Sequence, residues 1–351
     1  MSEPNLSRRE LFATSAIAAT GALGAPSEAQ ARNPRAPINI LAEGLDEKYA
    51  SQIRNISRQI TLVQNVNGDR NAALNRADAM WGGLTPEEQR IATRLRWLQY
   101  PAAGVESILT PTFVQSDIIL TNAKGCYAPE IAEHAFGLLF SLSRNIAMHV
   151  RLMREHKWQQ GARPTELRGL TMGIVGLGGI GREVARRAKV MDMHVIAVDA
   201  EPMYGEHFHM VDDISLVDVG LKNLMSTADV VISCAPITKR TEGMFGAEQF
   251  GWMKPTAWFI NVSRGRLVQT PALVAALKSG KIAGAGLDVT SPEPLPTNHA
   301  LWDMPNVVVT PHIAGQSQLA VERTQQVFVE NVKRYVSGQP LLNIVDKNKG
   351  Y

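Results

Sequence analysis

Cysteine, charge of one sign and long apolar runs are all scarce in this sequence. The two cysteines, Cys126 and Cys234, are too few for a disulfide framework or a four-cysteine zinc site, so we expect free thiols and no metal. The sequence contains no run of roughly 18 apolar residues, so it predicts no membrane-spanning helix. The net charge is +3 without a Lys/Arg-rich stripe, which argues against a nucleic-acid partner. The 351 residues, 45% of them hydrophobic, are typical of a globular protein with two domains.

Residues 1–31 have the pattern of an export signal. The pair Arg8-Arg9 precedes an Ala-rich apolar stretch, and Ala29-Gln30-Ala31 is a small-x-small cleavage site. The arginine pair resembles twin-arginine signals, which a receptor reads. We therefore expect a periplasmic mature chain without stable membrane insertion. Two alternatives stay open: an accidental arginine pair in a disordered tail, or a misplaced start codon before an ordinary cytoplasmic protein.

Short apolar segments alternate with helical ones from residue 170 onward. Strands are predicted at residues 171–175, 194–198, 229–235, 257–262, 283–287 and 307–310. Strands separated by helices form parallel sheets covered on both faces. The pattern predicts an α/β domain with a doubly wound parallel sheet.

A glycine-rich turn follows the first of these strands and opens the next helix. Gly176 permits a tight turn, Gly178 allows a pyrophosphate to approach the backbone, and Gly181 allows close packing of helix on strand. Asp199 stands 18 residues after Gly181, where an acid can accept hydrogen bonds from the adenosine ribose. The turn therefore predicts a dinucleotide site, the alternative being a structural turn with a surface Asp.

Asp199 also indicates which dinucleotide is bound. Its carboxylate would repel the 2′-phosphate of NADP, and the following residues Ala200-Glu201-Pro202 supply no cation to offset that repulsion. NAD is therefore the expected cofactor, with NADP the less favoured alternative.

Three polar residues follow three later strands. Arg264 follows residues 257–262, Glu293 comes soon after residues 283–287, and His312 follows residues 307–310. Ligands of open parallel sheets bind outside the carboxyl ends of the strands. We expect these three side chains to form one site.

The segments GLGGIG, INVSRGRLV, GLDVTSPEPLP and TPHIAG, in this order, resemble those of the D-isomer-specific 2-hydroxyacid dehydrogenase family. Two further segments, LRWLQYPAAGV at 95–105 and NAKGCYAPEIAEH at 122–134, resemble its substrate-carboxylate loop and the entry to its interdomain helix. The resemblance covers nearly the whole chain after residue 31. It implies an NAD-dependent oxidoreductase acting on a 2-hydroxy or 2-oxo acid, and we expect a homodimer.

The chemistry suits the residue types. Arg264 can hold the substrate carboxylate in bidentate fashion and polarise the neighbouring oxygen. His312 can take up or return the hydroxyl proton, and Glu293 beside it stabilises the cationic imidazole and selects its tautomer. The resemblance implies substrate contacts from Tyr100, Ala103, Gly104 and Val105 besides Arg264, and cofactor contacts from Gly176, Gly178, Gly179, Ile180, Gly181, Asp199, Ala235, Pro236, Val262, Ser263, Arg264, Asp288, His312 and Gly315.

The rest of the chain predicts a second α/β domain without a glycine turn. Strands are expected at residues 38–42, 60–64, 79–81 and 96–100, and long helices at 131–153 and 318–336. We expect a discontinuous flavodoxin-like substrate domain with linker helices (residues 37–135 and 316–346), a Rossmann NAD-binding domain (residues 136–315), and substrate in the cleft between them. Residues 341–345 should add back to the first domain.

Other functions fit the same residues. Formate dehydrogenases share the fold but replace the acid beside the histidine with glutamine, so Glu293 argues against them. Phosphite-oxidising relatives keep all three residues and stay open. A non-catalytic NAD-binding protein, or an exported scaffold with a vestigial site, would lack turnover.

Overall fold

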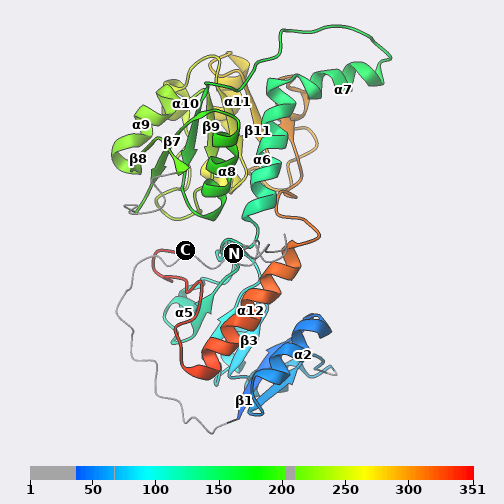
Figure 1. Cartoon of the computed structure of the whole chain (residues 1–351), viewed down its shortest axis with the longest axis vertical. Helices are drawn as coiled ribbons and strands as arrows, with labels where there is room; N and C mark the ends of the chain where they lie inside the picture. Colours follow the sequence, from blue (N-terminus) through cyan, green and yellow to red (C-terminus); the bar gives the residue numbers. More distant parts are fainter. Residues whose placement is uncertain (1–36, 67, 202–209) are drawn as a thin grey trace, which may run out of the picture. The chain divides into compact units, whose positions relative to one another are not determined.

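The computed structural model describes residues 37–66, 68–201 and 210–351 (Figure 1). The predicted signal at 1–31 lies outside the described residues. Two compact units are defined by their internal contacts: unit 1 holds the described residues up to Cys126 and Val321–Lys347, and unit 2 holds Tyr127–Ala320 and Asn348–Tyr351. Both units are α/β, each with its own parallel sheet.

Unit 1 contains a five-stranded parallel sheet in the order β2-β1-β3-β4-β5. Its strands are β1 (Ile38–Ala42), β2 (Ile60–Val63), β3 (Ala79–Trp81), β4 (Trp97–Gln99) and β5 (Ile119–Thr121). Its helices are α2 (Glu47–Ile56), α3 (Arg70–Arg76), α4 (Pro86–Ile91), α5 (Pro111–Val114) and α12 (Ala320–Ser337). The order is that of flavodoxin-like sheets, as expected.

Late parts of the chain complete the core of unit 1. Phe328 of α12 is fully buried, and its ring centroid lies 5.0 Å from that of Trp81 and 5.6 Å from that of Trp97, with the rings tilted by 40° and 42°. Val345 is buried as well, and its N–H donates to the carbonyl of Leu120 at 2.9 Å. The segment 341–345 therefore returns to this unit, as its sequence predicted.

Unit 2 contains a seven-stranded parallel sheet in the order β12-β11-β10-β9-β6-β7-β8. Its strands are β6 (Thr171–Val175), β7 (His194–Asp199), β8 (Asp213–Leu216), β9 (Val230–Ser233), β10 (Trp258–Asn261), β11 (Gly284–Leu287) and β12 (Val307–Val309). This is the doubly wound dinucleotide-binding order with one added strand, and it reverses between β6 and β9.

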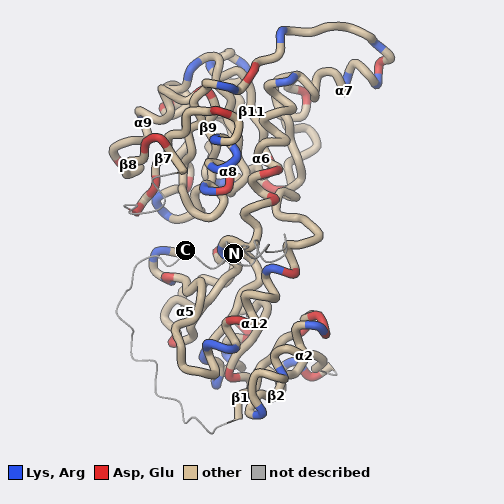
Figure 2. Tube along the Cα trace, viewed as in Figure 1, with Lys and Arg blue, Asp and Glu red and all other residues tan. Residues whose placement is uncertain are grey.

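Helices cover both faces of this sheet (Figure 1). Alternate residues of β6 show this, because Ile174 belongs to one apolar cluster and Val175 to the other. The helices are α6 (Ala128–Ser143), α7 (Ile146–Arg154), α8 (Gly179–Val190), α9 (Val217–Thr227), α10 (Ala247–Trp252) and α11 (Thr270–Lys278). Lys and Arg are interspersed with Asp and Glu along both units (Figure 2).

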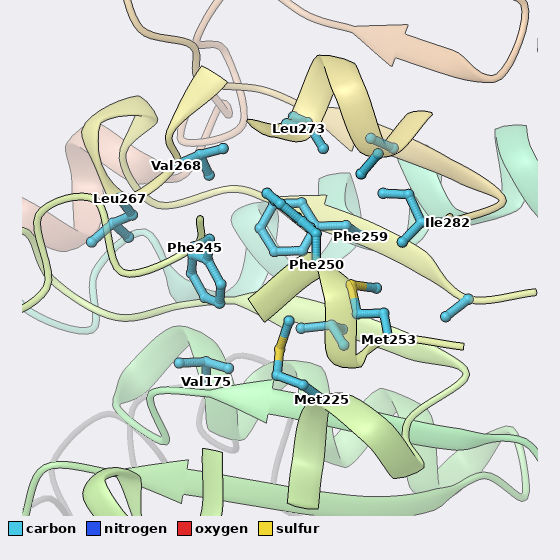
Figure 3. Close-up of a cluster of buried hydrophobic side chains, with 14 of the residues drawn as sticks. Val175, Met225, Phe245, Phe250, Met253, Phe259, Leu267, Val268, Leu273 and Ile282 are labelled. Carbon is cyan, nitrogen blue, oxygen red and sulfur yellow. The ribbon is translucent and has the colours of Figure 1, made fainter. Parts of the chain in front are cut away.

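One apolar cluster anchors the segment that carries Arg264. Phe259 of β10 packs against Phe245 at 5.0 Å and Phe250 at 5.3 Å between ring centroids (Figure 3). Leu267, three residues after Arg264, is fully buried in the same cluster. The chain is thus held on both sides of Arg264.

The helix predicted at residues 131–153 is two helices, so that expectation is wrong. Asn145 adopts the left-handed conformation with φ of 56° between α6 and α7, and its side-chain amide donates to the carbonyl of Ala162 at 2.6 Å. Asn tolerates this conformation, which an uninterrupted helix cannot contain. No helix among the described residues has the length and apolar character needed to cross a bilayer.

Candidate active site

Two glycines of the turn after β6 are required by packing. Gly176 has φ of 96°, and a Cβ there would lie 2.8 Å from the backbone nitrogen of Ala235, at the end of β9. A Cβ on Gly181 would collide with the carbonyl oxygen of Gly176. The turn, the start of α8 and the end of β9 therefore pack closely where the strand order reverses, and Pro236 continues from that point.

Gly178 differs from these two. A Cβ on Gly178 would meet no protein atom within 4 Å, and its φ of −71° is open to any residue. It caps α8, whose first turn contains Gly179 and Ile180 and presents N–H groups that the helix does not pair. An open surface beside a helix N-terminus fits a pyrophosphate, so the turn fits a dinucleotide.

Asp199 lies at the end of β7, beside this turn. Its carboxylate accepts hydrogen bonds from the N–H groups of Leu177 at 2.7 Å and Glu201 at 3.1 Å. Half-buried Arg182 of α8 donates to the carbonyl of Leu177 at 3.1 Å. Burial lowers the pKa of Arg182, and the charge of Asp199 opposes that shift, so the guanidinium lies within the field of this carboxylate. A cation is therefore present, on a helix rather than in the segment after Asp199.

Arg264, Glu293 and His312 follow three neighbouring strands, β10, β11 and β12. Leu287 of β11 pairs with Asn261 of β10 and with Val309 of β12, so the three strands end at the same level. The predicted grouping of these residues at one sheet edge is what the topology produces.

The segments that carry Arg264 and Glu293 touch directly. A Cβ on Gly265, next to Arg264, would collide with the backbone carbonyl of Thr290. Only glycine allows the two backbones to approach so closely. This contact fixes the spacing between the loops after β10 and β11.

His312 and Glu293 form a direct contact. Nδ1 of His312 lies 2.5 Å from Oε1 of Glu293, and the two side chains are 47% and 38% exposed. The carboxylate thereby selects the tautomer with a proton on Nδ1, which leaves Nε2 available for a substrate. His312 itself has φ of 55°, a conformation that its surroundings must hold.

Asp288 holds the turn that contains His312. Its carbonyl accepts from the N–H of His312 at 2.8 Å, and its carboxylate accepts from the N–H groups of Ile313 at 3.0 Å and Ala314 at 2.9 Å. The hydroxyl of Thr310 donates to the same carboxylate at 2.6 Å. Asp288 is 2% exposed, so its carboxylate mainly accepts hydrogen bonds from other groups of the protein.

His134 of α6 adds a second support that the sequence did not reveal. Its Nε2 lies 2.7 Å from the Thr310 hydroxyl and 3.4 Å from the carboxylate of Asp288. His134 and Thr310 are 176 residues apart in the sequence, so no local pattern indicates this contact.

The loop before Arg264 is held by its own polar groups. Asn261 is fully buried; its amide donates to the carbonyl of Arg264 at 3.0 Å, and its oxygen accepts from the N–H of Ser263 at 3.2 Å. The Arg264 guanidinium donates to the Ser263 carbonyl at 2.8 Å and is partly exposed. Val262 and Ser263 are buried, and Gly315 lies against the ring of Tyr127, the residue before α6, with 3.6 Å between an added Cβ and that ring.

The predicted substrate loop lies in unit 1, after β4. Tyr100 shares a hydrogen bond of 3.1 Å with the Ser107 hydroxyl, and the carbonyl of Ala103 accepts from the Asn122 amide at 2.6 Å. Within the part of the chain that the structure describes, the N–H groups of Ala103, Gly104 and Val105 donate to no protein acceptor. Three such donors in sequence suit a carboxylate.

A glycine turn where the strand order reverses, followed along the same edge by an arginine and a carboxylate-bound histidine, fits a nicotinamide-dependent oxidoreductase of a small anion such as a 2-hydroxy acid. The family model described as D-isomer specific 2-hydroxyacid dehydrogenase, NAD binding domain, matches residues 136–314. The chain belongs to this family.

Relatives extend the similarity beyond the matched region. A glyoxylate reductase of Pyrococcus furiosus is 32% identical over 332 residues, covering 90% of this chain and 93% of that protein. A D-3-phosphoglycerate dehydrogenase of Archaeoglobus fulgidus is 35% identical over 256 residues, covering 73% of this chain; the chain spans about half (48%) of its length. A solved family member from Xanthobacter autotrophicus, in complex with NADPH and MES, is 26% identical with a TM-score of 0.76, covering 90% of this chain and 100% of that one.

Proposed function

We propose that this chain reduces a small 2-oxo acid to the 2-hydroxy acid, with Arg264, Glu293 and His312 as its catalytic residues. The contact of 2.5 Å between His312 and Glu293, beside Arg264 on the neighbouring strand ends, carries the proposal. The Pyrococcus relative is named a glyoxylate reductase, which supports a small substrate of this type.

Each residue has a separate task in this reaction. Arg264 binds the substrate carboxylate and polarises its keto oxygen. His312, protonated on Nε2, gives its proton to that oxygen, while Glu293 on Nδ1 stabilises the cation before transfer. The nicotinamide, when bound, supplies the hydride. The N–H groups of Ala103, Gly104 and Val105 are proposed to bind the substrate carboxylate as well.

Replacement of Arg264 tests the proposal. Arg264→Ala should lower kcat/KM for glyoxylate by about 100-fold or more, since several kcal/mol of carboxylate and oxyanion stabilisation is lost. The Kd for NADH should stay within about threefold. Arg266→Ala is a matched control, because this exposed arginine two residues away pairs with Glu242 at 2.6 Å.

The same assays separate the alternative functions. Purified protein should be screened with glyoxylate, hydroxypyruvate, pyruvate, phenylpyruvate and branched 2-oxo acids, and with phosphite in the oxidising direction. A chain that binds NADH and turns over none of them would be the non-catalytic NAD-binding protein instead. Normal turnover by Arg264→Ala would remove Arg264 from the mechanism.

For the cofactor we propose a preference for NAD(H) over NADP(H). Asp199 supports it, because a carboxylate accepts hydrogen bonds from a free ribose and repels a 2′-phosphate. The NADPH complex of the Xanthobacter relative makes a direct comparison necessary. Titration of the purified protein with NADH and NADPH tests the preference, and tighter NADPH binding would overturn it.

We also propose export to the periplasm, on the strength of Arg8, Arg9 and the cleavage pattern at residues 29–31. Twin-arginine export moves folded proteins, so NAD(H) can be loaded before transfer. Cell fractionation with the pair intact or changed to lysine tests export, and release of dinucleotide on denaturation tests loading. Cytoplasmic retention of the unaltered chain would overturn the export proposal.

The proposed assembly is a homodimer, with α7 and the residues that follow it at the interface. Met153 and Trp158 are 65% and 103% exposed there, and Ile146 and Val150 are exposed on the same helix. Such apolar side chains are typical of a covered surface. Light scattering should give the mass of two chains, and Met153→Lys with Trp158→Lys should give one.

A further inference from the structure

The segment Asn348–Tyr351 belongs to unit 2, although the residues before it belong to unit 1. Nζ of Lys349 pairs with Oε1 of Glu201 at 2.7 Å, with the two side chains 52% and 50% exposed. The Tyr351 hydroxyl donates to the same carboxylate oxygen at 3.4 Å. Glu201 comes two residues after Asp199, so the segment contacts the chain close to the end of β7.

Tyr351 also lies within the field of Asp199. Its pKa is raised, first by partial burial and then by the charge of Glu201, with Asp199 contributing to the same direction. Lys349 opposes the shift. The direct contact of the segment is with Glu201, two residues along the chain from the acid that is proposed to bind ribose.

The described side chains at this end of β7 include charges of both signs. Asp199 and Glu201 contribute two negative charges, and Arg182 and Lys349 contribute two positive ones. Without Lys349, a bound 2′-phosphate would face both carboxylates and one partly buried guanidinium. Lys349 neutralises Glu201, and its flexible side chain can turn from that carboxylate to a phosphate.

We propose that the segment 348–351 forms part of the adenosine-ribose end of the cofactor site, and that Lys349 sets how strongly this site rejects the 2′-phosphate of NADP(H). The inference rests on the proposed use of a nicotinamide dinucleotide at the Gly176–Gly181 turn. It makes Lys349 a specificity-determining residue supplied from outside the sheet.

The test is binding of NADH and NADPH to the purified full chain, followed by nicotinamide fluorescence without any substrate. Lys349→Glu adds a negative charge where a positive one stood. The Kd for NADPH should rise about five- to tenfold at low ionic strength, and the Kd for NADH should stay within about twofold. The NADPH effect should shrink at 1 M salt, where the Debye length is about 3 Å.

Two controls keep the test specific. Lys48→Glu changes the charge of another exposed lysine, in unit 1, that pairs with Glu322 at 2.9 Å, and it should change neither Kd. Lys349→Arg keeps the charge and should retain wild-type discrimination. A thermal melt of each variant identifies any loss of folding.

The outcomes distinguish this inference from the proposed function. Lys349→Glu that leaves the ratio of the two Kd values unchanged would overturn the inference alone. So would a wild-type chain that binds NADH and shows no NADPH binding at all. A folded wild-type chain that binds neither dinucleotide would overturn the proposed function, and the inference with it.

Discussion

The backbone carbonyl of Asp288 accepts a hydrogen bond from the N–H of His312 at 2.8 Å, and the Asp288 carboxylate binds the N–H groups of the next two residues. The imidazole that we propose as the proton donor therefore sits on a turn built around a buried acid. Its left-handed φ of 55° is held by these three bonds.

Asp288→Asn should disturb this turn. An amide keeps one acceptor oxygen and presents its NH₂ group to the other N–H donor, so one buried bond is lost at about 1–3 kcal/mol. We expect kcat to fall about tenfold or more and the melting temperature to fall by several degrees. Asp218→Asn, an exposed acid paired with Arg240, is the control. If Asp288 also contacts the cofactor, as the family resemblance implies, the Kd for NADH will rise as well.

Glu293→Gln should slow 2-oxo acid reduction. The carboxylate oxygen lies 2.5 Å from Nδ1 of His312, and an amide at this position removes the negative charge that stabilises the imidazolium during proton transfer. We expect kcat to fall about tenfold or more, while the Kd for NADH stays within about twofold. Glu242→Gln serves as the control. A kcat equal to that of the wild type would refute the pairing.

Gly178→Ala and Gly181→Ala should separate binding from folding. Alanine at 178 meets no protein atom, so its melting temperature should stay near wild type, while the methyl group occupies space proposed for the pyrophosphate. The Kd for NADH should rise about tenfold or more. Alanine at 181 collides with the Gly176 carbonyl and should cost about 1–3 kcal/mol of unfolding free energy. Calorimetry and NADH titration on both variants provide the comparison.

Both thiols should be unreactive in the native chain. Burial raises the pKa of Cys234 to about 12, and Cys126 is 5% exposed. The thiolate is the reactive form, so a thiol reagent at pH 8 should rapidly label fewer than one thiol per native chain. In denaturant it should label both thiols. Denatured, unreduced protein without any labelling would reveal a disulfide formed after export.

Strong local patterns made most of the sheet predictable. Near-continuous apolar runs, such as residues 171–175 and 257–262, are typical of strands buried on both faces. The strands β5 and β8 were not predicted from the sequence. The strand β5 is only three residues long, and β8 begins with Asp213 and is partly exposed. The break between two helices at Asn145 was not predicted, because apolar residues continue past it.

Only those residues of the candidate site that lie at strand ends or within motifs could be predicted from the sequence. Arg264, Glu293 and His312 follow neighbouring strands, so topology alone groups them. The hydrogen bonds between His134, Thr310 and Asp288 join positions up to 176 residues apart, and no local pattern encodes such a contact. Lys349 is a similar case, since its partner Glu201 is 148 residues away.

The division of unit 1 has a consequence for synthesis on the ribosome. Its strands β1 to β5 are translated first, yet Phe328 and Val345, which complete its core, come after residue 320. At about 5–20 residues per second, roughly 10–40 s separate β5 from α12. Unit 2 can therefore close its own core while the earlier strands still wait for their apolar cover. The N-terminal strands of this protein are therefore the last to complete their core. A chaperone that binds those strands would release them only at the end of translation.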